Sequence, residues 1–435
     1  MLQKSSTGKE MIAAVDLGSS HCVTLIAHRE AGGGIKIVGL GEVPSRGVRR
    51  ATIINLEQAT QTIERSVAMA EQMCGNNIDS VYLNVSGQHI GSRNSHGTVV
   101  VAGDAIVESD VDRAIESARA ISLPADQEIL NLMPRFYTVD GQEGIVDPLD
   151  MVGMRLDVDI HLITANSSVL RNLEKALSNV GLAKEALVFN GYAAAEVVLD
   201  DNEKNAGAIC IDVGSDTTSF CVYADGAIQV SGVVPIGGRY VSQDINAYTR
   251  VGLDNAEKIK LDLVHESDET IKQKEGETRE EYRRRYKAAD VFDLTKYDPH
   301  VKPASVSKNM LIRNVIGARH REIFTLIATE LKKHKLHDKL GAGAVIVGGG
   351  AQTIGLSEVA MQTLGMQVRV GIPRGIDGVI RHLDDPRYAT AIGLLHYAIR
   401  DQAAASVETP EPIQKKSSWD SFLAGVSKKF RNLMP

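Results

Sequence analysis

Residues 12–20 read Ile-Ala-Ala-Val-Asp-Leu-Gly-Ser-Ser, and residues 208–218 read Ala-Ile-Cys-Ile-Asp-Val-Gly-Ser-Asp-Thr-Thr. In both stretches a β-rich run ends in Asp-x-Gly-Ser and a second β-rich run follows, which predicts two β-hairpins with tight turns. Such turns present several backbone N–H groups to an anion, and glycine lets the backbone approach a phosphate closely. One copy alone is consistent with an ordinary hairpin. Two copies indicate two similar domains that face each other across a nucleotide.

Each repeat also places an aspartate at the end of its first strand, Asp16 in one and Asp212 in the other. Hard divalent cations prefer carboxylate oxygens and keep part of their water shell. We therefore expect both aspartates to hold Mg²⁺ through water molecules beside the phosphates.

A third glycine-rich turn lies further along the chain. Residues 344–347, Ala-Val-Ile-Val, lead into Gly348, Gly349 and Gly350, and a helix-like stretch follows at residues 356–364. A strand-to-helix turn of this type can lie flat beside a nucleotide. The dinucleotide-binding alternative lacks the acidic residue expected about 20 positions later, and the sequence has no G-x-x-x-x-G-K-[ST] phosphate loop.

The remaining sequence alternates strands with amphipathic helices, which indicates an α/β architecture. The 435 residues, 43% of them hydrophobic, suffice for two large domains. Residues 81–85, 159–164 and 345–347 are predicted as strands, and residues 168–180 as a helix that stops at Gly181. The densely charged segment 266–303 is expected to form an exposed helical or mobile insertion.

The composition excludes several classes of protein. The net charge of −7 argues against a globally basic protein, so no nucleic-acid partner is expected. No long uncharged apolar run is present, so no transmembrane helix is expected, and the polar first ten residues lack a signal-peptide core, which indicates a cytosolic start. The four cysteines have no zinc spacing and are expected to be reduced, mostly buried thiols.

The order of these motifs resembles the superfamily of actin, Hsp70 and the sugar kinases. The resemblance implies ATP with Mg²⁺ as the ligand and Gly348–Gly350 as the adenosine turn. It further implies that Glu257 and Lys260, in the sequence Ala-Glu-Lys-Ile-Lys, contact the ribose and adenine, although the same pattern is typical of a salt-bridged surface helix. The expected nucleotide-binding residues are Asp16, Gly18, Ser19, Ser20, Asp212, Gly214, Ser215, Asp216, Thr217, Thr218, Gly237, Gly238, Glu257, Lys260, Gly348, Gly349 and Gly350.

Within that superfamily the chain resembles the FtsA family of bacterial cell-division proteins over nearly its whole length. The motifs that carry this likeness are residues 81–90, 143–145, 161–164 and 385–397. The family implies an actin-like two-domain fold with a duplicated core, an inserted subdomain and a C-terminal amphipathic helix. The expected divisions are 11–84 with 162–205 and 388–400 as the first core domain (1A), 85–161 as the insertion (1C), 206–240 with 341–387 as the second core domain (2A), 241–340 as subdomain 2B including the insertion 266–303, 401–417 as a linker and 418–435 as the terminal helix.

Two positions depart from the family pattern. Asn190 stands at the start of the helix that links the domains, where relatives that hydrolyse ATP well place Gln or Glu to orient water. Its neutral amide cannot act as a general base near neutral pH, so at most slow ATPase activity is expected. Ser215 and Asp216 stand where many relatives have two glycines, so Asp216 is expected to crowd the γ-phosphate or to bias the metal dependence.

The C-terminal segment has the pattern of an interfacial membrane helix. Bulky apolar residues recur at helical spacing, basic residues flank them, and the segment is too short to span a bilayer. The alternative is a helix docked on the protein's own surface, but a polar linker with Pro410 and Pro412 separates it from the body. The expected membrane-binding residues are Trp419, Phe422, Leu423, Val426, Lys428, Lys429, Phe430, Arg431 and Leu433.

The sequence therefore predicts an ATP-binding protein that polymerises on the cytoplasmic face of the inner membrane at midcell. The resemblance implies the tubulin-like FtsZ as chief partner, bound through its C-terminal peptide, with Arg313 and Arg319 as candidate contacts unless they are simply solvated. It also implies self-association into filaments, anionic lipids as the membrane ligand and recruitment of other division proteins. Two alternatives stay open: a pilus-assembly scaffold of similar fold, and a small-molecule kinase of the same superfamily.

Overall fold

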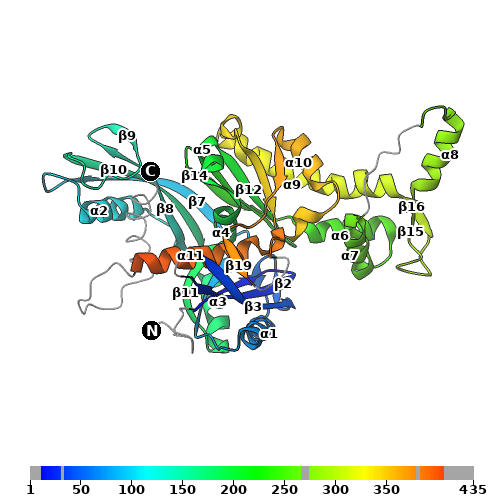
Figure 1. Ribbon diagram of the computed structural model, residues 1–435, viewed down its shortest axis with the longest axis horizontal. Coiled ribbons are helices and arrows are strands. Elements are labelled where there is room, and N and C mark those ends of the chain that lie inside the picture. Colours follow the sequence, from blue (N-terminus) through cyan, green and yellow to red (C-terminus); the bar gives the residue numbers. More distant parts are fainter. Residues whose placement is uncertain (1–10, 31–33, 266–273, 379–382, 406–435) are drawn as a thin grey trace.

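The structure is a computed structural model that describes residues 11–30, 34–265, 274–378 and 383–405. Figure 1 shows an elongated molecule, with a four-stranded sheet at one end and helix α8 (Arg279–Ala289) near the other. Two larger sheets lie between these ends, and the candidate site lies where they face each other.

The first large sheet has six strands in the order β11-β6-β1-β2-β3-β19. Its strands are β1 (Met11–Leu17), β2 (His21–Arg29), β3 (Ile35–Pro44), β6 (Ser80–Val85), β11 (Ala183–Phe189) and β19 (Ile376–Gly378). A small hairpin of β4 (Val48–Arg49) and β5 (Thr52–Ile53) follows β3. Helices α1 (Leu56–Cys74) and α3 (Ser167–Val180) pack together and contribute to the same hydrophobic core. The predicted helix stop is confirmed, since Gly181 caps α3 in the left-handed conformation.

The second large sheet repeats this plan with five strands in the order β14-β13-β12-β17-β18. Its strands are β12 (Ala208–Val213), β13 (Thr218–Ala224), β14 (Ala227–Val234), β17 (Gly343–Val347) and β18 (Val368–Val370). Strand β1 pairs antiparallel with β2 and parallel with β6, and β12 pairs in the same way with β13 and β17. Helices α9 (Gly317–Lys333) and α10 (Leu356–Leu364) bury their apolar residues against this sheet. The two hairpins predicted from the repeat are therefore equivalent strands of two similar sheets.

The four-stranded sheet interrupts the first half of the chain. Its order is β7-β10-β8-β9, formed by β7 (Gly91–Val100), β8 (Gln127–Val139), β9 (Gln142–Ile145) and β10 (Arg155–Asn166). Helix α2 (Glu108–Arg119) packs on β7 and β10, and a hydrophobic core separate from that of the large sheets holds this part together.

The part beyond the second hairpin is mostly helical and has its own core. It contains α6 (Gly238–Thr249), α7 (Leu253–Asp262), α8, the strand pair β15 (Val291–Asp293) and β16 (Ser305–Ser307), and a π-helix over Met310–Ile316 that leads into α9. Helix α8 begins at a capping box of Thr278 and Glu281 and has no buried residue, which confirms an exposed helix within the charged segment. The expectation is wrong for the end of the segment, because the apolar side chains of Phe292, Leu294 and Val301 are buried in the core of this part. Residues 266–273 of that segment lie outside the described residues.

Two helices join the halves: α4 (Asn190–Val198) and α11 (Ala389–Ala405). They pack so closely that a Cβ atom at Gly393 would lie 2.0 Å from the carbonyl oxygen of Ala193, so only glycine is tolerated there. Helix α11 continues through Ala405, so the expected linker 401–417 begins too early. Asp401-Gln-Ala-Ala-Ala contains strong helix formers, which extend the helix. The remaining short helices are α5 (Asp201–Ala206), Leu263–His265, His337–Lys339, Gly349–Gln352 and Pro386–Tyr388.

Candidate functional site

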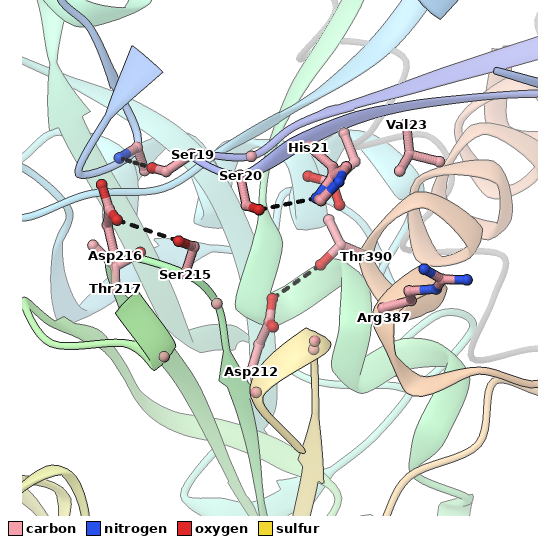
Figure 2. Close-up of a pocket in the computed structure, with 18 of the residues that line it drawn as sticks. Ser19, Ser20, His21, Val23, Asp212, Ser215, Asp216, Thr217, Arg387 and Thr390 are labelled. Carbon is pink, nitrogen blue, oxygen red and sulfur yellow. Dashed lines mark hydrogen bonds between the residues drawn. The ribbon is translucent and has the colours of Figure 1, made fainter. Parts of the chain in front are cut away.

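A cavity of about 360 Å³ lies between the turns of the two repeated hairpins (Figure 2). The turn after β1 and the turn after β12 contribute opposite walls, and the glycine-rich turn after β17 and helix α7 contribute further parts of the lining. All expected nucleotide-binding residues except Thr218 and Gly237 line it. Thr218 is fully buried in β13, where its hydroxyl donates to the carbonyl oxygen of Ile236 at 2.7 Å. Gly237 lies behind the second turn, where a Cβ atom would collide with the Gly214 and Ser215 carbonyl oxygens.

The two hairpin turns have the same backbone geometry. The N–H of Gly18 donates to the carbonyl oxygen of His21 at 3.0 Å, and the N–H of Gly214 donates to that of Thr217 at 3.0 Å. A Cβ atom at Gly18 would lie 2.9 Å from the same carbonyl oxygen, and one at Gly214 would lie 3.0 Å from its own. Each turn therefore requires glycine to close, and the small polar residues of each turn line the cavity.

Burial disfavours the ionised forms of both Asp16 and Asp212. Burial, and then the charge of Asp212, raise the pKa of Asp16 to about 8, while a hydrogen bond from Asn84 opposes the shift. Burial also raises the pKa of Asp212, against hydrogen bonds from Thr390 and Asn190. A divalent cation near both would reverse this by favouring the ionised forms. Among the described residues no group of three or more His, Cys, Asp or Glu side chains is placed to hold a metal ion.

Three successive glycines form the turn after β17, and each has a different neighbour. A Cβ atom at Gly348, whose φ is +83°, would lie 2.3 Å from Oδ1 of Asp212, and one at Gly350 would lie 2.4 Å from Cγ1 of Val213. A Cβ atom at Gly349 would meet nothing within 4 Å and would enter the cavity. This turn therefore keeps one flat, open wall.

Helix α7 brings Glu257 and Lys260 to the cavity as an ion pair, with 2.9 Å between Lys260 Nζ and Glu257 Oε2. Lys260 also donates to the carbonyl oxygen of Gly238 at 3.2 Å, and Ser242 donates to Glu257. The ion pair expected of a salt-bridged helix is therefore present, and both residues line the cavity. Their contact with ribose and adenine stays a prediction.

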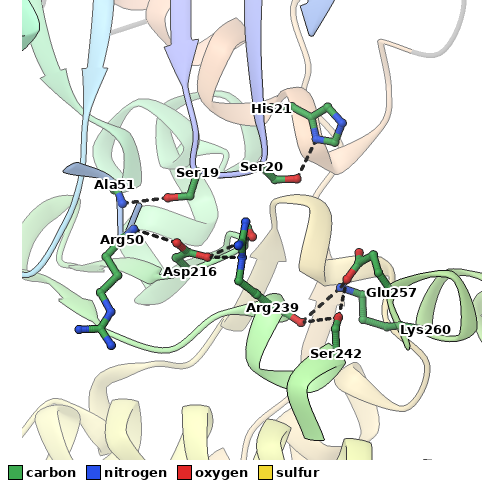
Figure 3. A network of polar contacts seen from close by, with 12 residues as sticks. Ser19, Ser20, His21, Arg50, Ala51, Asp216, Arg239, Ser242, Glu257 and Lys260 are labelled. Carbon is green, nitrogen blue, oxygen red and sulfur yellow. Dashed lines mark hydrogen bonds and ion pairs between the residues drawn. The ribbon is translucent and has the colours of Figure 1, made fainter. Parts of the chain in front are cut away.

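One contact joins the two halves of the chain at the cavity, and two contacts within the halves support it (Figure 3). The N–H of Arg50, at the tip of the β4–β5 hairpin, donates to Oδ2 of Asp216 at 2.8 Å. The N–H of Ala51 donates to Ser19 Oγ at 2.8 Å, and Arg239 pairs with Oδ1 of Asp216 at 2.9 Å. Asp216 is thus held by groups from both halves.

Asn190 begins α4, as predicted, and its amide donates to Oδ2 of Asp212 at 2.9 Å. Its own Oδ1 is buried and has no hydrogen-bond partner among the described residues. A buried amide oxygen without a partner is costly unless a ligand or water meets it. Because Asn190 lines the cavity, this orphaned acceptor is consistent with a site built to hold a hydrated ligand.

Several lining residues were not predicted. Asn84 accepts the N–H of Leu17 at 2.7 Å at the end of β6, and Thr390 donates to Oδ2 of Asp212 at 3.0 Å from the start of α11. Arg387, half-exposed, pairs with Glu42 at 3.4 Å. Asn84 and residues 385–397 belong to motifs that carry the family resemblance in the sequence. Those motifs could therefore have indicated that these residues line the site.

The two candidate partner-binding arginines lie away from the cavity. Arg319 is held by Asp244, with Nε–Oδ2 and Nη2–Oδ1 distances of 2.7 and 2.9 Å, and its guanidinium lies over the ring of Tyr240. Arg313 lies exposed on the π-helix. The expected membrane-binding residues 419–433 lie outside the described residues. Within the described part, no helix combines the length and apolar character needed to cross a membrane.

Comparisons with known proteins agree along the chain. The family described as "SHS2 domain inserted in FTSA" matches residues 87–164, and the family described as "Cell division protein FtsA" matches residues 209–393. The chain is 32% identical over 394 residues to cell division protein FtsA of Pseudomonas aeruginosa, covering 91% of this chain and 90% of the relative. It is 33% identical over 422 residues to FtsA of Neisseria meningitidis serogroup B, covering 97% and 98%.

Solved structures share the fold at low identity. The chain resembles a protein in a PilM–PilN type IV pilus biogenesis complex with a TM-score of 0.59 and 15% identity, covering 89% of this chain and 98% of that one. It resembles MreB5 of Spiroplasma citri with a TM-score of 0.51 and 13% identity, covering 92% and 99%.

Proposed function

Because this chain belongs to the FtsA family of cell-division proteins, we propose that it binds ATP with Mg²⁺ and tethers the division ring to the inner membrane. Its role in division and its actin-like fold with an inserted subdomain follow from the family, and the fold predicted from the sequence is confirmed. Nucleotide binding, membrane attachment and FtsZ binding are the proposal.

The observation that carries the nucleotide proposal is the cavity between the repeated turns. The turns at Gly18 and Gly214 would hold phosphate oxygens with their backbone N–H groups. Asp16 and Asp212 would hold the water molecules of Mg²⁺, which neutralises the phosphates, and the open face of Gly349 leaves room for adenosine. MreB5 of Spiroplasma citri was solved bound to ADP, and for this chain an adenine nucleotide of the same class is our proposal.

Nucleotide binding would act through the two joining helices. Asn190 of α4 and Thr390 of α11 both donate to Oδ2 of Asp212, so a change in the charge or hydration of that carboxylate would reach both helices. In the proposed function the bound nucleotide closes the two halves and favours the conformation that polymerises. Asn190 supplies no general base, so the ATP-bound form persists as a structural state.

Membrane attachment is proposed for the C-terminal segment, whose sequence pattern is that of an interfacial helix. One short helix with a few basic residues binds weakly, since each basic residue near an anionic surface contributes roughly 1 kcal/mol. Polymerisation would place many such helices on one membrane and raise the overall affinity. The FtsZ C-terminal peptide is the proposed partner of the region around Arg313, and recruitment of later division proteins would follow from assembly of this polymer.

Family membership favours this division role over the two alternatives. The likeness to the PilM–PilN complex, at 15% identity, extends to the fold alone. A small-molecule kinase would need a carboxylate base beside an acceptor hydroxyl. Of the aspartates that line the cavity, Asp16 and Asp212 are assigned to the cation, and Asp216 is held by Arg50 and Arg239.

Localisation of a fluorescent fusion in the organism that encodes the chain tests the division role. The full chain should form a band at midcell, and a fusion lacking residues 418–435 should lose the membrane band while remaining folded. As a control, FtsZ depletion should disperse the band of the full chain. An even distribution of the full-length fusion in dividing cells would contradict the role.

A further inference from the structure

The two hairpins of the repeat differ in one charge. Aligned through Asp16 and Asp212 and through the turn glycines, Ser20 of the first hairpin corresponds to Asp216 of the second. Ser20 is exposed, and its hydroxyl lies 2.9 Å from Nδ1 of His21. Asp216 is only 3% exposed and lines the cavity. A buried carboxylate therefore stands inside a turn whose backbone suits an anion.

Groups from both halves of the chain hold this carboxylate (Figure 3). Its Oδ2 accepts the backbone N–H of Arg50 at 2.8 Å, and its Oδ1 forms an ion pair with Arg239, 2.9 Å from Nε. The hydroxyl of Ser215 lies 3.3 Å from Oδ1. Arg50 belongs to the first half, whereas Arg239 and Ser215 belong to the second. Asp216 thus joins the two halves across the cavity.

The Arg50 contact is made by a turn that is itself unfavourable. Val48 pairs with Ile53 and Arg49 with Thr52, which leaves Arg50 and Ala51 as a two-residue loop with φ values of 50° and 57°. Loops of this kind normally carry Asn-Gly, because other residues are strained at positive φ. The strain persists only where the surroundings fix it, and here the two N–H groups are taken by Asp216 and by Ser19.

We propose that Asp216 is a built-in anion that closes the cavity from its phosphate side and thereby reduces the preference for a nucleoside triphosphate over a diphosphate. The inference rests on the proposed nucleotide site. Asp216 already occupies the Arg50 N–H and the Arg239 guanidinium, two donors suited to a terminal phosphate. An ionised carboxylate also repels a terminal phosphate at short range. The third phosphate of a nucleoside triphosphate therefore adds little to the binding free energy and little to the closure of the cavity.

Competition binding with labelled ATP and ADP in Mg²⁺ buffer tests this preference. Asp216→Ser restores the residue of the first hairpin, and Asp216→Asn removes the charge while keeping an acceptor for Arg50. The exposed Asp225, on the turn after β13, provides the matched control Asp225→Asn. We expect the wild type to bind ATP and ADP with similar affinities, and both Asp216 variants to favour ATP by at least about tenfold more than the wild type or the control.

Amide hydrogen exchange on the nucleotide-free chain tests the closure separately. The segment 48–53 should exchange faster in Asp216→Ser and near the wild-type rate in Asp216→Asn. An ATP-to-ADP preference that is unchanged in both variants, with tight binding retained, overturns the inference and leaves the proposed function standing. Unchanged exchange in Asp216→Ser overturns it as well. If the wild type binds neither nucleotide, the proposed function fails and the assigned preference fails with it.

Discussion

The side-chain amide of Asn190 donates a 2.9 Å hydrogen bond to Oδ2 of Asp212, and this bond places the first residue of α4 in the wall of the cavity. Thr390, near the start of α11, donates to the same oxygen at 3.0 Å. One carboxylate therefore anchors both helices that join the two halves. The amide N–H of Asn190 is committed to this contact, and its side chain is neutral, so it lacks the basicity to take a proton from water.

Hydrolysis should accordingly be slow. We expect steady-state phosphate release from Mg-ATP far below the typical enzyme rate, which is on the order of 10 per second. The measurement is phosphate release under saturating ATP, with the Gly349→Glu variant as a control for contaminating ATPases. Turnover near the typical rate would show that another group activates the water.

The free energy of unfolding of the nucleotide-free and Mg²⁺-free chain should fall as the pH rises from 5 towards 8. The pKa of Asp16 is raised to about 8, above its value of about 3.9 in the unfolded chain. The folded state thus favours the protonated group. Its stabilising contribution is complete below the unfolded pKa and is lost as the pH rises through the folded pKa.

Asp16→Asn should reduce this pH dependence, because an amide carries no proton to lose, and the remainder should come from Asp212, whose pKa burial also raises. Urea unfolding between pH 5 and 8 should show the difference between variant and wild type growing by at least about 1 kcal/mol, the equivalent of one pKa unit. Asp225→Asn provides the exposed control. Parallel pH profiles for the wild type and Asp16→Asn would show that Asp16 is not forced towards its neutral form.

The parts of this site that the sequence revealed are those with local signatures. The Asp-x-Gly-Ser turns recur, and each requires glycine at its own position, so the repeat predicts both hairpins and their facing arrangement. The Gly348–Gly350 turn likewise has a local signature, three successive glycines after a strand. Its glycines are forced by close neighbours at Gly348 and Gly350, and only Gly349 faces open space.

Other parts depend on contacts between distant elements. The β4–β5 hairpin has two residues in each strand and no Asn-Gly at its turn, so no pattern predicts that Arg50 reaches Asp216. Thr390 reaches Asp212 only because α11 returns between the sheets. Glu196 likewise stands in an apolar helical sequence that gives no sign of its three polar partners.

Because of those partners, we expect Glu196 to contribute to the free energy of unfolding. Its carboxylate, buried between the joining helices, accepts from Lys204 Nζ at 3.1 Å, from the hydroxyl of Tyr223 at 2.8 Å and from Arg400. Glu196→Gln removes the negative charge and leaves two partly buried cations, Lys204 and Arg400, uncompensated, which should lower the free energy of unfolding by about 2 kcal/mol. Glu330→Gln breaks an exposed pair with Lys333 and should cost less than about 1 kcal/mol. Urea unfolding that gives equal losses for both variants would contradict the assigned role of the buried pair.

The C-terminal segment should bind membranes by two separable routes. Trp419→Ala with Phe422→Ala removes apolar insertion and should release the protein from vesicles even at low salt. Lys428→Glu with Lys429→Glu removes charge attraction and should weaken binding most on anionic lipid. Added salt should mimic the second change and not the first, since salt at 0.1 M largely screens the attraction between charges more than about 10 Å apart.

Vesicle co-sedimentation measures each case, and deletion of residues 418–435 provides the reference. The truncated chain should stay in the supernatant and still bind ATP. If it pellets with lipid as well as the full chain does, the C-terminal segment is not the anchor.

The proposed function requires a nucleotide between the repeated hairpins, and equilibrium binding of labelled ATP with Mg²⁺ to the Gly349→Glu variant tests for it. Gly349 faces open space in the cavity, so a glutamate there would fill the adenosine position without disturbing the backbone. Gly103→Glu places the same side chain on an exposed loop, where its Cβ would meet its nearest neighbour at 3.7 Å. We predict that Gly349→Glu loses at least about tenfold in ATP affinity while remaining folded, and that Gly103→Glu binds as the wild type does. Equal ATP affinity in the wild type and in Gly349→Glu would contradict the proposed site.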